Sequence, residues 1–283
     1  MNDSDFEFLA SMLKERSGLV VTKDKLYLLE SRLLPLAKDQ QLDGLEGLIT
    51  ALRAPGSDSL KEQVTEAMTT NESFFFRDQT PFDNFKEVVL PELLERNAAR
   101  KQIRIWCCAA STGQEPYSLA MLLSEEAAKL RDWRVEILAT DISGEVLEKA
   151  KVGLYSQFEV QRGLPITLLA KYFAESGSMW QIDSALRAMV TYKPFNLLDN
   201  MTHLGQFDMV FCRNVLIYFD VDAKTEILGR ISRQMSPGGS LFLGAAETVI
   251  GVTDDFVPVK GRRGLYALQG AASSADVPLV AGA

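Results

Sequence analysis

The fold of this chain is decided by residues 103–115, which read Ile103-Arg104-Ile105-Trp106-Cys107-Cys108 and then Ala109-Ala110-Ser111-Thr112-Gly113-Gln114-Glu115. The first six residues form an almost continuous apolar run, which is typical of a parallel strand buried on both faces. The next seven are small or polar, and a helical pattern from about Pro116 to Leu130 follows them. A strand, a tight turn and a helix in this order indicate a doubly wound α/β sheet.

The same alternation continues toward the C-terminus. A second buried strand is expected at Val135–Ala139, and Asp141 follows it directly. Four more strands are expected at Met189–Tyr192, Phe207–Cys212, Ser240–Gly244 and Gly264–Leu268. Between Tyr155 and Val190 the alternation lapses, and Met179–Ile182 predicts part of a hairpin. We therefore expect an α/β fold with a mostly parallel sheet and a small antiparallel β subdomain inserted at about residues 155–190.

The first 78 residues show a helical pattern of apolar residues instead. Apolar residues recur at helical spacing in two segments, 6–13 and 26–36, and a further helix is expected at Leu60–Met68. A helix from Phe82 to Arg96 then leads into the first strand. We therefore predict a small all-α domain at 1–78 and the α/β domain at 79–270. Residues 271–283 are mostly small and lack periodicity, so a disordered tail is expected there.

Composition excludes several classes of protein. The net charge is −8, and nucleic-acid binding requires a basic surface, so no nucleic-acid partner is expected. The acidic start of the chain does not resemble a secretory signal. No apolar run reaches the roughly 20 residues that a membrane span needs. These features predict a cytoplasmic protein without membrane insertion.

Cysteine and histidine are scarce. The three cysteines, Cys107, Cys108 and Cys212, lie in apolar runs, where Cys usually behaves as a small buried side chain. The single histidine, His203, is expected to be an exposed bystander. A zinc site or a Ser-His-Asp triad needs more such residues, so we predict no metal.

The turn after the first strand is a candidate ligand site. In doubly wound folds a nucleotide-like ligand binds beyond the carboxyl ends of the strands. The small side chains there let a ligand approach the backbone, although Gly113 is the only glycine and the dinucleotide fingerprint is absent. Asp141 has two readings: it accepts hydrogen bonds from ribose hydroxyls, or it caps the helix that begins near Ser143.

Two other stretches combine apolar and polar residues unusually. Residues 69–78 place three consecutive phenylalanines between polar residues and end in Arg77-Asp78. Residues 211–219 run from a buried strand directly into Arg213-Asn214 and reach Tyr218. Tyr218 is either an ordinary core residue or a residue of a site at this edge.

Together these stretches resemble the chemotaxis receptor methyltransferases, the CheR family. The matching motifs are Thr70–Arg77, Ala110–Ser118, Ala139–Ser143, Phe195–Leu198 and Cys212–Phe219. Their order and spacing cover the chain from about residue 5 to residue 268. The resemblance implies a Rossmann-like, S-adenosylmethionine-dependent methyltransferase domain behind a small helical domain. The implied activity is protein-glutamate O-methylation on chemotaxis receptors for sensory adaptation, with S-adenosylhomocysteine as the product.

The resemblance also implies the site residues. Its cofactor contacts fall on Asn71, Ser73, Arg77, Glu115, Asp141, Asn196, Leu197, Arg213 and Asn214. Arg77 and Tyr218 match positions proposed to line the methyl-transfer site. Ser73 stands where relatives often have Thr, and Gln114 where they often have Glu, and both changes keep a polar side chain.

The implied partners are the cytoplasmic helical domains of methyl-accepting chemotaxis receptors, met by a monomeric enzyme. Arg32 and Lys38 remain from the arginine cluster that relatives carry on the second helix, and they are the predicted receptor contacts. Pro35 is expected to kink or end that helix. Two other functions stay open: a non-catalytic module that senses S-adenosylmethionine, and a methyltransferase that acts on another protein carboxylate.

Overall fold

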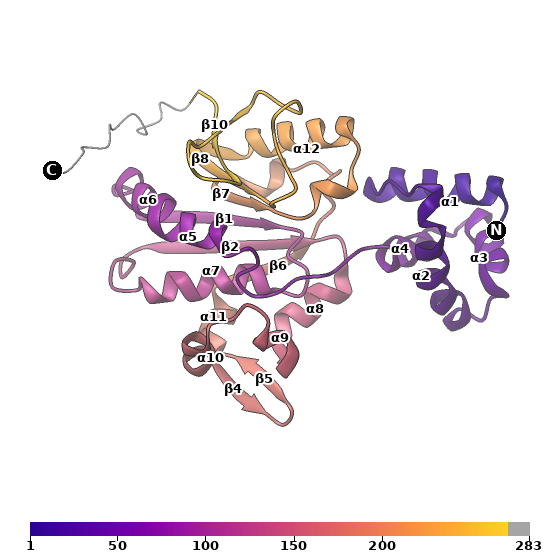
Figure 1. Cartoon of the computed structure of the whole chain (residues 1–283), viewed down its shortest axis with the longest axis horizontal. Coiled ribbons are helices and arrows are strands. Elements are labelled where there is room, and N and C mark those ends of the chain that lie inside the picture. The colour runs from indigo at the N-terminus through magenta and orange to yellow at the C-terminus, as the bar shows by residue number, and fades with distance from the viewer. Residues whose placement is uncertain (271–283) are drawn as a thin grey trace.

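A seven-stranded sheet forms the centre of the molecule in this computed structural model, which describes residues 1–270 (Figure 1). Its strand order is β6-β2-β1-β7-β8-β10-β9. Five strands are parallel: β1 (Gln102–Cys108), β2 (Arg134–Asp141), β6 (Val190–Pro194), β7 (Phe207–Cys212) and β8 (Met235–Leu243). Two short antiparallel strands, β9 (Phe256–Pro258) and β10 (Leu265–Leu268), complete one edge. The strand order reverses between β1 and β7, and the mostly parallel sheet that the sequence predicts is confirmed.

Strand β1 is covered on both faces, which explains its continuous apolar sequence. Ile103, Ile105 and Cys107 belong to one hydrophobic core, whereas Trp106 and Cys108 belong to another on the opposite face. The first core is covered by α5 (Thr80–Asn84), η2 (Phe85–Val89), α6 (Leu90–Arg96), α7 (Gln114–Glu125) and α8 (Gly144–Val152). The second is covered by α12 (Val221–Arg233). All three cysteines are buried and free, and burial raises the pKa of the Cys107 and Cys108 thiols.

A second, three-stranded sheet lies in the insertion that the sequence predicts. Its order is β3-β5-β4, with β3 at Leu154–Ser156, β4 at Phe173–Ser176 and β5 at Met179–Ile182, all paired antiparallel. The short helices α9 (Gln157–Gln161), α10 (Ile166–Tyr172) and α11 (Ser184–Ala188) complete it. Figure 1 shows this subdomain below the main sheet, beside α7 and α8. The predicted hairpin is therefore present as β4 and β5.

The N-terminal helices form a domain with its own apolar core. They are α1 (Asp3–Ser17), η1 (Lys23–Lys25), α2 (Leu26–Asp39), α3 (Gly44–Arg53) and α4 (Asp58–Ala67). Figure 1 places this domain beyond the carboxyl ends of the sheet strands. Among the described residues, no helix is long and apolar enough to cross a membrane. The predicted disordered tail, 271–283, lies outside the described residues.

Several local expectations differ from the structure, among them two helix bounds and the effect of Pro35. The helix after Gly113 ends at Glu125 rather than Leu130. The helix expected at 82–96 contains the π turn η2 just before Pro91, which cannot donate a hydrogen bond to the carbonyl four residues earlier. Pro35 does not end α2, which continues to Asp39. Because Ser31 is exposed, the carbonyl that Pro35 leaves without a helical partner is able to bind water instead.

Candidate active site

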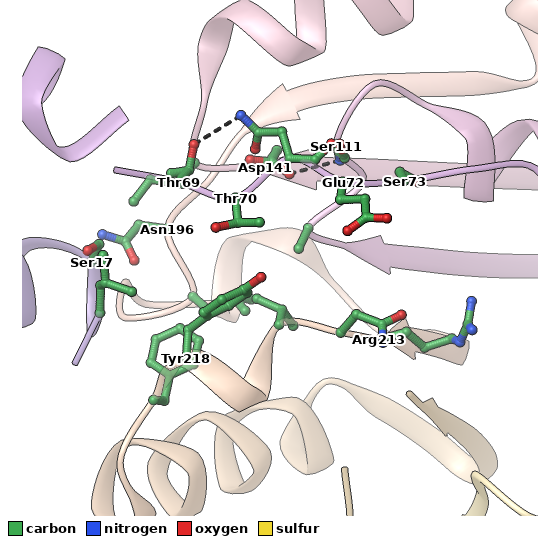
Figure 2. Close-up of a pocket in the computed structure, with 18 of the residues that line it drawn as sticks. Ser17, Thr69, Thr70, Glu72, Ser73, Ser111, Asp141, Asn196, Arg213 and Tyr218 are labelled. Carbon is green, nitrogen blue, oxygen red and sulfur yellow. Dashed lines mark hydrogen bonds between the residues drawn. The ribbon is translucent and has the colours of Figure 1, made fainter. Parts of the chain in front are cut away.

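A pocket opens at the carboxyl ends of β1, β2 and β7, where the strand order reverses. It encloses about 1010 Å³, including space open to solvent. This is where doubly wound folds bind nucleotide-like ligands. One wall comes from the helical domain, which contributes Ser17, Leu19, Thr65 and Met68. The pocket therefore lies between the two domains (Figure 2).

The structure brings the sequence-predicted cofactor residues together. All of them line this pocket: Asn71, Ser73, Arg77, Glu115, Asp141, Asn196, Leu197, Arg213 and Asn214. Tyr218, in the 3₁₀ helix η4 (Leu216–Tyr218), also lines the pocket. In Figure 2 its hydroxyl points toward the chain segment that carries Thr70 and Glu72. Arg32 and Lys38, the predicted receptor contacts, lie outside the pocket on α2.

Asp141 is the last residue of β2 and is buried at the pocket floor. Its two carboxylate oxygens accept hydrogen bonds from the backbone N–H groups of Ser111 (2.9 Å) and Ser143 (3.0 Å). Burial raises the pKa of Asp141, and these backbone donors oppose the rise. The N-cap of α8 is Ser143, whose hydroxyl accepts from Val146 N–H. The alternative reading of Asp141 as the cap of this helix is therefore wrong.

The turn between β1 and α7 is held in an unusual backbone conformation. Ala109 and Ser111 have φ values of 57° and 50°, in the left-handed region that side chains other than glycine rarely adopt. Gly113 has φ 93°, and an added Cβ would lie 2.8 Å from the Tyr192 hydroxyl and 2.9 Å from Ala150 Cβ. Glycine is therefore required here by both the backbone angle and the packing of the turn against α8.

Arg213 is buried beside the pocket with only 1% of its side chain exposed. It forms ion pairs with Glu115 (2.7 Å) and Asp78 (2.8 Å), and it donates a hydrogen bond to the Arg77 carbonyl. Burial raises the pKa of Glu115, and Arg213 opposes that rise. Arg213 therefore fixes the segment that carries Arg77 and Asp78 against α7.

A cluster of charged and aromatic side chains surrounds the pocket residues Glu72 and Arg77. Arg77 donates to the Glu72 carbonyl (2.8 Å), and its guanidinium lies 5.5 Å from the Phe74 ring centre. Arg162, from the inserted subdomain, pairs with the Glu72 carboxylate (2.6 Å) and lies 4.3 Å from the same ring. The Arg162 guanidinium lowers the pKa of Glu72. Phe74 is partly exposed, and its ring lies beside two cations.

The comparisons with known proteins agree with this geometry. Residues 4–69 match the family described as CheR methyltransferase, all-alpha domain, and residues 71–265 match the family described as CheR methyltransferase, SAM binding domain. The chain belongs to the CheR methyltransferase family. Its cofactor is S-adenosylmethionine, and both the family and the cofactor that the motifs predict are confirmed.

Curated relatives of this CheR chain match over nearly their whole length. It is 41% identical over 265 residues to the chemotaxis protein methyltransferase Cher2 of Pseudomonas putida, covering 92% of this chain and 96% of the relative. It is 42% identical over 267 residues to chemotaxis protein methyltransferase 1 of Pseudomonas aeruginosa, covering 93% and 97%. For chemotaxis protein methyltransferase 1 of Vibrio cholerae the identity is 35% over 268 residues, covering 94% and 96%. The chain is thus a chemotaxis methyltransferase.

The sequence motifs did not reveal how the CheR helical domain is joined to the sheet domain. Asn196 donates to the Arg16 carbonyl (2.6 Å), and Val20 N–H donates to the Tyr218 carbonyl (3.1 Å). Between them Gly18 has φ 72°, and an added Cβ would lie 2.3 Å from the Phe219 ring. A glycine just after an amphipathic helix is the only signal of this joint in the sequence, and it is equally typical of an isolated helix C-terminus.

Glu66, at the end of α4, forms a second joint. Its carboxylate accepts from the Ser143 hydroxyl (2.7 Å) and from Glu145 N–H (3.0 Å), at the N-terminus of α8. A negative charge is favourable there because the first N–H groups of a helix lack partners within it. No local sequence pattern identifies this contact, since the residues are almost 80 positions apart.

Glu247 supports the site without lining the pocket, and sequence reasoning missed it. Its carboxylate accepts hydrogen bonds from four backbone N–H groups: those of Asn214 (2.7 Å), Val215 (2.9 Å), Leu216 (2.7 Å) and Gly244 (2.7 Å). Asn214 and Val215 belong to the loop between β7 and η4, and Leu216 is the first residue of η4. One carboxylate therefore fixes the backbone that leads to Tyr218.

Replacing Glu247 by Gln is expected to lower kcat by roughly tenfold, because the loop that positions Tyr218 loosens. Each carboxylate oxygen accepts from two N–H groups, so an amide NH₂ in either position faces two donors. Steady-state kinetics at saturating cofactor measures this. Glu226→Gln, which removes an exposed carboxylate on α12, is the control. Equal kcat in the Glu247 and Glu226 variants contradicts a positioning role for Glu247.

Proposed function

We propose that this CheR methyltransferase transfers the methyl group of S-adenosylmethionine to glutamate side chains on the cytoplasmic helical domains of methyl-accepting chemotaxis receptors. The products are glutamate methyl esters and S-adenosylhomocysteine, and the enzyme acts in the cytoplasm as a monomer. The observation that carries the proposal is that Arg77 and Tyr218 share one pocket with all the cofactor positions of the family. A binding-only module has no need of both residues at that place.

The pocket offers suitable partners for each part of the cofactor. Asp141 retains lone pairs that can accept hydrogen bonds from the ribose hydroxyls. Glu115 is a buried carboxylate. A cationic group of the cofactor would stabilise its ionised form. Arg213 is already paired with two carboxylates, so we assign it to holding the pocket wall rather than to a direct ionic contact.

The chemistry asks for position rather than for a base. A glutamate side chain has a pKa of about 4.3 in water and is ionised at neutral pH, so its oxygen is ready to attack. S-adenosylmethionine supplies an electrophilic methyl group when it is bound. Arg77 orients a carboxylate with its remaining N–H groups, and Tyr218 donates a hydrogen bond from its hydroxyl. Bound cofactor and substrate would displace water from the pocket around the reacting atoms.

Transfer of labelled methyl groups to receptor-containing membranes tests the proposal. We expect label on the receptor that alkali releases as methanol, because carboxylate esters are labile to base. Label that resists base would exclude ester formation. Base-labile label on other proteins alone would favour a methyltransferase for another protein carboxylate. Binding of S-adenosylmethionine without transfer to any protein would favour a non-catalytic sensing module.

We propose that the receptor docks on the exposed face of α2. Lys38 lies on this face, is exposed and does not line the pocket. Lys38→Glu is expected to lower the receptor methylation rate roughly twofold to fivefold at low salt, with a smaller effect at high salt. Affinity for S-adenosylhomocysteine should not change. The measurement is the initial methylation rate on membranes at several ionic strengths. An unaltered rate at low salt would place docking on another surface.

A further inference from the structure

Arg32 projects from α2 onto the segment that joins the two domains. Its guanidinium donates to the carbonyls of Met68 (2.6 Å) and Thr69 (2.9 Å) and to the Thr70 hydroxyl (2.9 Å). All three acceptors belong to residues that line the pocket. Arg32 is only partly exposed, and its N–H groups are turned inward to the joining segment rather than outward to a receptor.

These bonds satisfy backbone carbonyls that have no partner within α4. Met68 and Thr69 follow the last residue of α4, so their carbonyls lie beyond the helix, where such groups need partners from elsewhere. Thr70 and Asn71 are exposed. A planar guanidinium suits this place because its fork of N–H groups can reach several acceptors at once, which a lysine ammonium cannot match in geometry.

The hydrogen bonds continue from Arg32 to the cofactor-binding residues. Asn71 donates from its amide to the Thr69 hydroxyl (3.1 Å), and its carbonyl accepts from the Ser111 hydroxyl (2.8 Å). The N–H of Ser111 in turn donates to Asp141 (2.9 Å). A connected path therefore runs from α2 through the joining segment to the residue at the end of β2.

We propose that Arg32 is a positioning residue of the S-adenosylmethionine site, which holds the wall formed by residues 68–71 in its binding conformation. The family resemblance places Arg32 among receptor contacts, and the structure assigns its guanidinium to the pocket wall instead. This inference rests on the proposed function of the pocket. The inner face of α2, which carries the Arg32 guanidinium, then belongs to the cofactor site, whichever partner binds the outer face of this helix.

The test is the Kd for S-adenosylhomocysteine, measured by calorimetry on the full chain. Arg32→Met is expected to raise Kd roughly tenfold, the size of effect found for residues that act on a site without touching the ligand. Arg32→Lys should recover only part of that loss, because it keeps the charge and loses the fork. Asp141→Ala serves as the direct-contact reference: if it binds as wild type does, the assignment of the pocket has failed rather than the role of Arg32.

Arg53 provides a matched control within the same domain. It contacts Ser4, Asp5 and the Phe8 ring, all inside the helical domain and away from the pocket lining. Arg53→Met should lower Tm and leave Kd unchanged. If Arg53→Met raises Kd as much as Arg32→Met does, the effect comes from general loss of the helical domain, and the proposal is overturned. A wild-type Kd in Arg32→Met overturns it as well.

Thr70→Val covers the case in which Arg32→Met does not fold. It removes one acceptor of Arg32 and is expected to raise Kd twofold to threefold. Where the double variant folds, it should bind no more weakly than Arg32→Met alone, because both changes break the same contact. Unchanged affinity in Thr70→Val, or fully additive losses in the double variant, would overturn the proposal.

Discussion

Asp141→Ala is expected to weaken binding of S-adenosylhomocysteine by more than tenfold while the chain stays folded. Hydrogen bonds to a charged acceptor contribute about 1.5–3 kcal/mol each, and roughly 1.4 kcal/mol corresponds to a factor of ten. The change removes the proposed acceptor for the ribose hydroxyls. It also frees the N–H of Ser111, so the turn after β1 loses an anchor. Calorimetry at a temperature well below Tm gives the affinity directly.

Ser143→Ala is the control for this prediction. Ser143 is the N-cap of α8 and also donates to Glu66, so its loss should cost stability of about 1 kcal/mol or more. Its side chain does not line the pocket, and the backbone N–H that Asp141 accepts from is retained. Affinity should therefore survive in Ser143→Ala. If Asp141→Ala keeps the same wild-type affinity as Ser143→Ala, Asp141 is not a cofactor contact and the assignment of this pocket has failed.

Tyr218→Phe is expected to lower kcat by roughly tenfold to a hundredfold with little change in cofactor affinity. The phenylalanine ring keeps the packing of η4, and the bond from Val20 N–H to the residue 218 carbonyl involves only the backbone. What is lost is the hydroxyl that points into the pocket (Figure 2). A positioning contact matters most when the reacting atoms lie about 3–3.5 Å apart, so the loss should fall on the transition state.

Single-turnover methylation, with cofactor affinity measured separately, checks this prediction. Tyr172→Phe is a useful comparison. The Tyr172 hydroxyl donates a hydrogen bond to Glu125 where the inserted subdomain meets α7, and neither residue lines the pocket. Full activity in Tyr218→Phe would make Tyr218 a packing residue. A large loss of cofactor affinity would instead make its hydroxyl a cofactor contact.

Much of the fold follows from short-range patterns. The apolar run at β1 predicts a strand covered on both faces, and β7 has the predicted bounds, Phe207–Cys212. The predicted end of α7 was wrong because residues 126–130 form hydrogen-bonded turns after Glu125, which still place Leu130 against the core as a longer helix would. Strand β9 was not predicted: it has three residues, two of them exposed, and pairs only with β10. Such a strand depends on its neighbour and leaves no periodic signal.

The candidate site divides in the same way. Residues in contiguous motifs, such as Asp141 and Tyr218, are predicted from the sequence and line the pocket, whereas Glu66 and Glu247 are not predicted. Each of the latter is a lone acidic residue whose partners are backbone N–H groups or hydroxyls on distant segments. A carboxylate that binds backbone leaves no mark on the sequence of its partner, because every residue except proline offers the same N–H. Arg32 is predicted as a receptor contact, whereas in the structure its guanidinium bonds the segment of residues 68–70.

The joint between the helical domain and the sheet domain restricts how these proteins can recombine. If the helical domain could be exchanged freely, one catalytic domain would be able to acquire new targets through the docking surface proposed for α2. Here the joint requires Gly18 against Phe219, Asn196 against the Arg16 carbonyl, and Glu66 against the start of α8. A transplanted helical domain that mismatches any of these would also deform the cofactor wall. With receptor docking on α2 as proposed, new targets are therefore more accessible through substitutions on the outer surface of α2 than through exchange of whole domains.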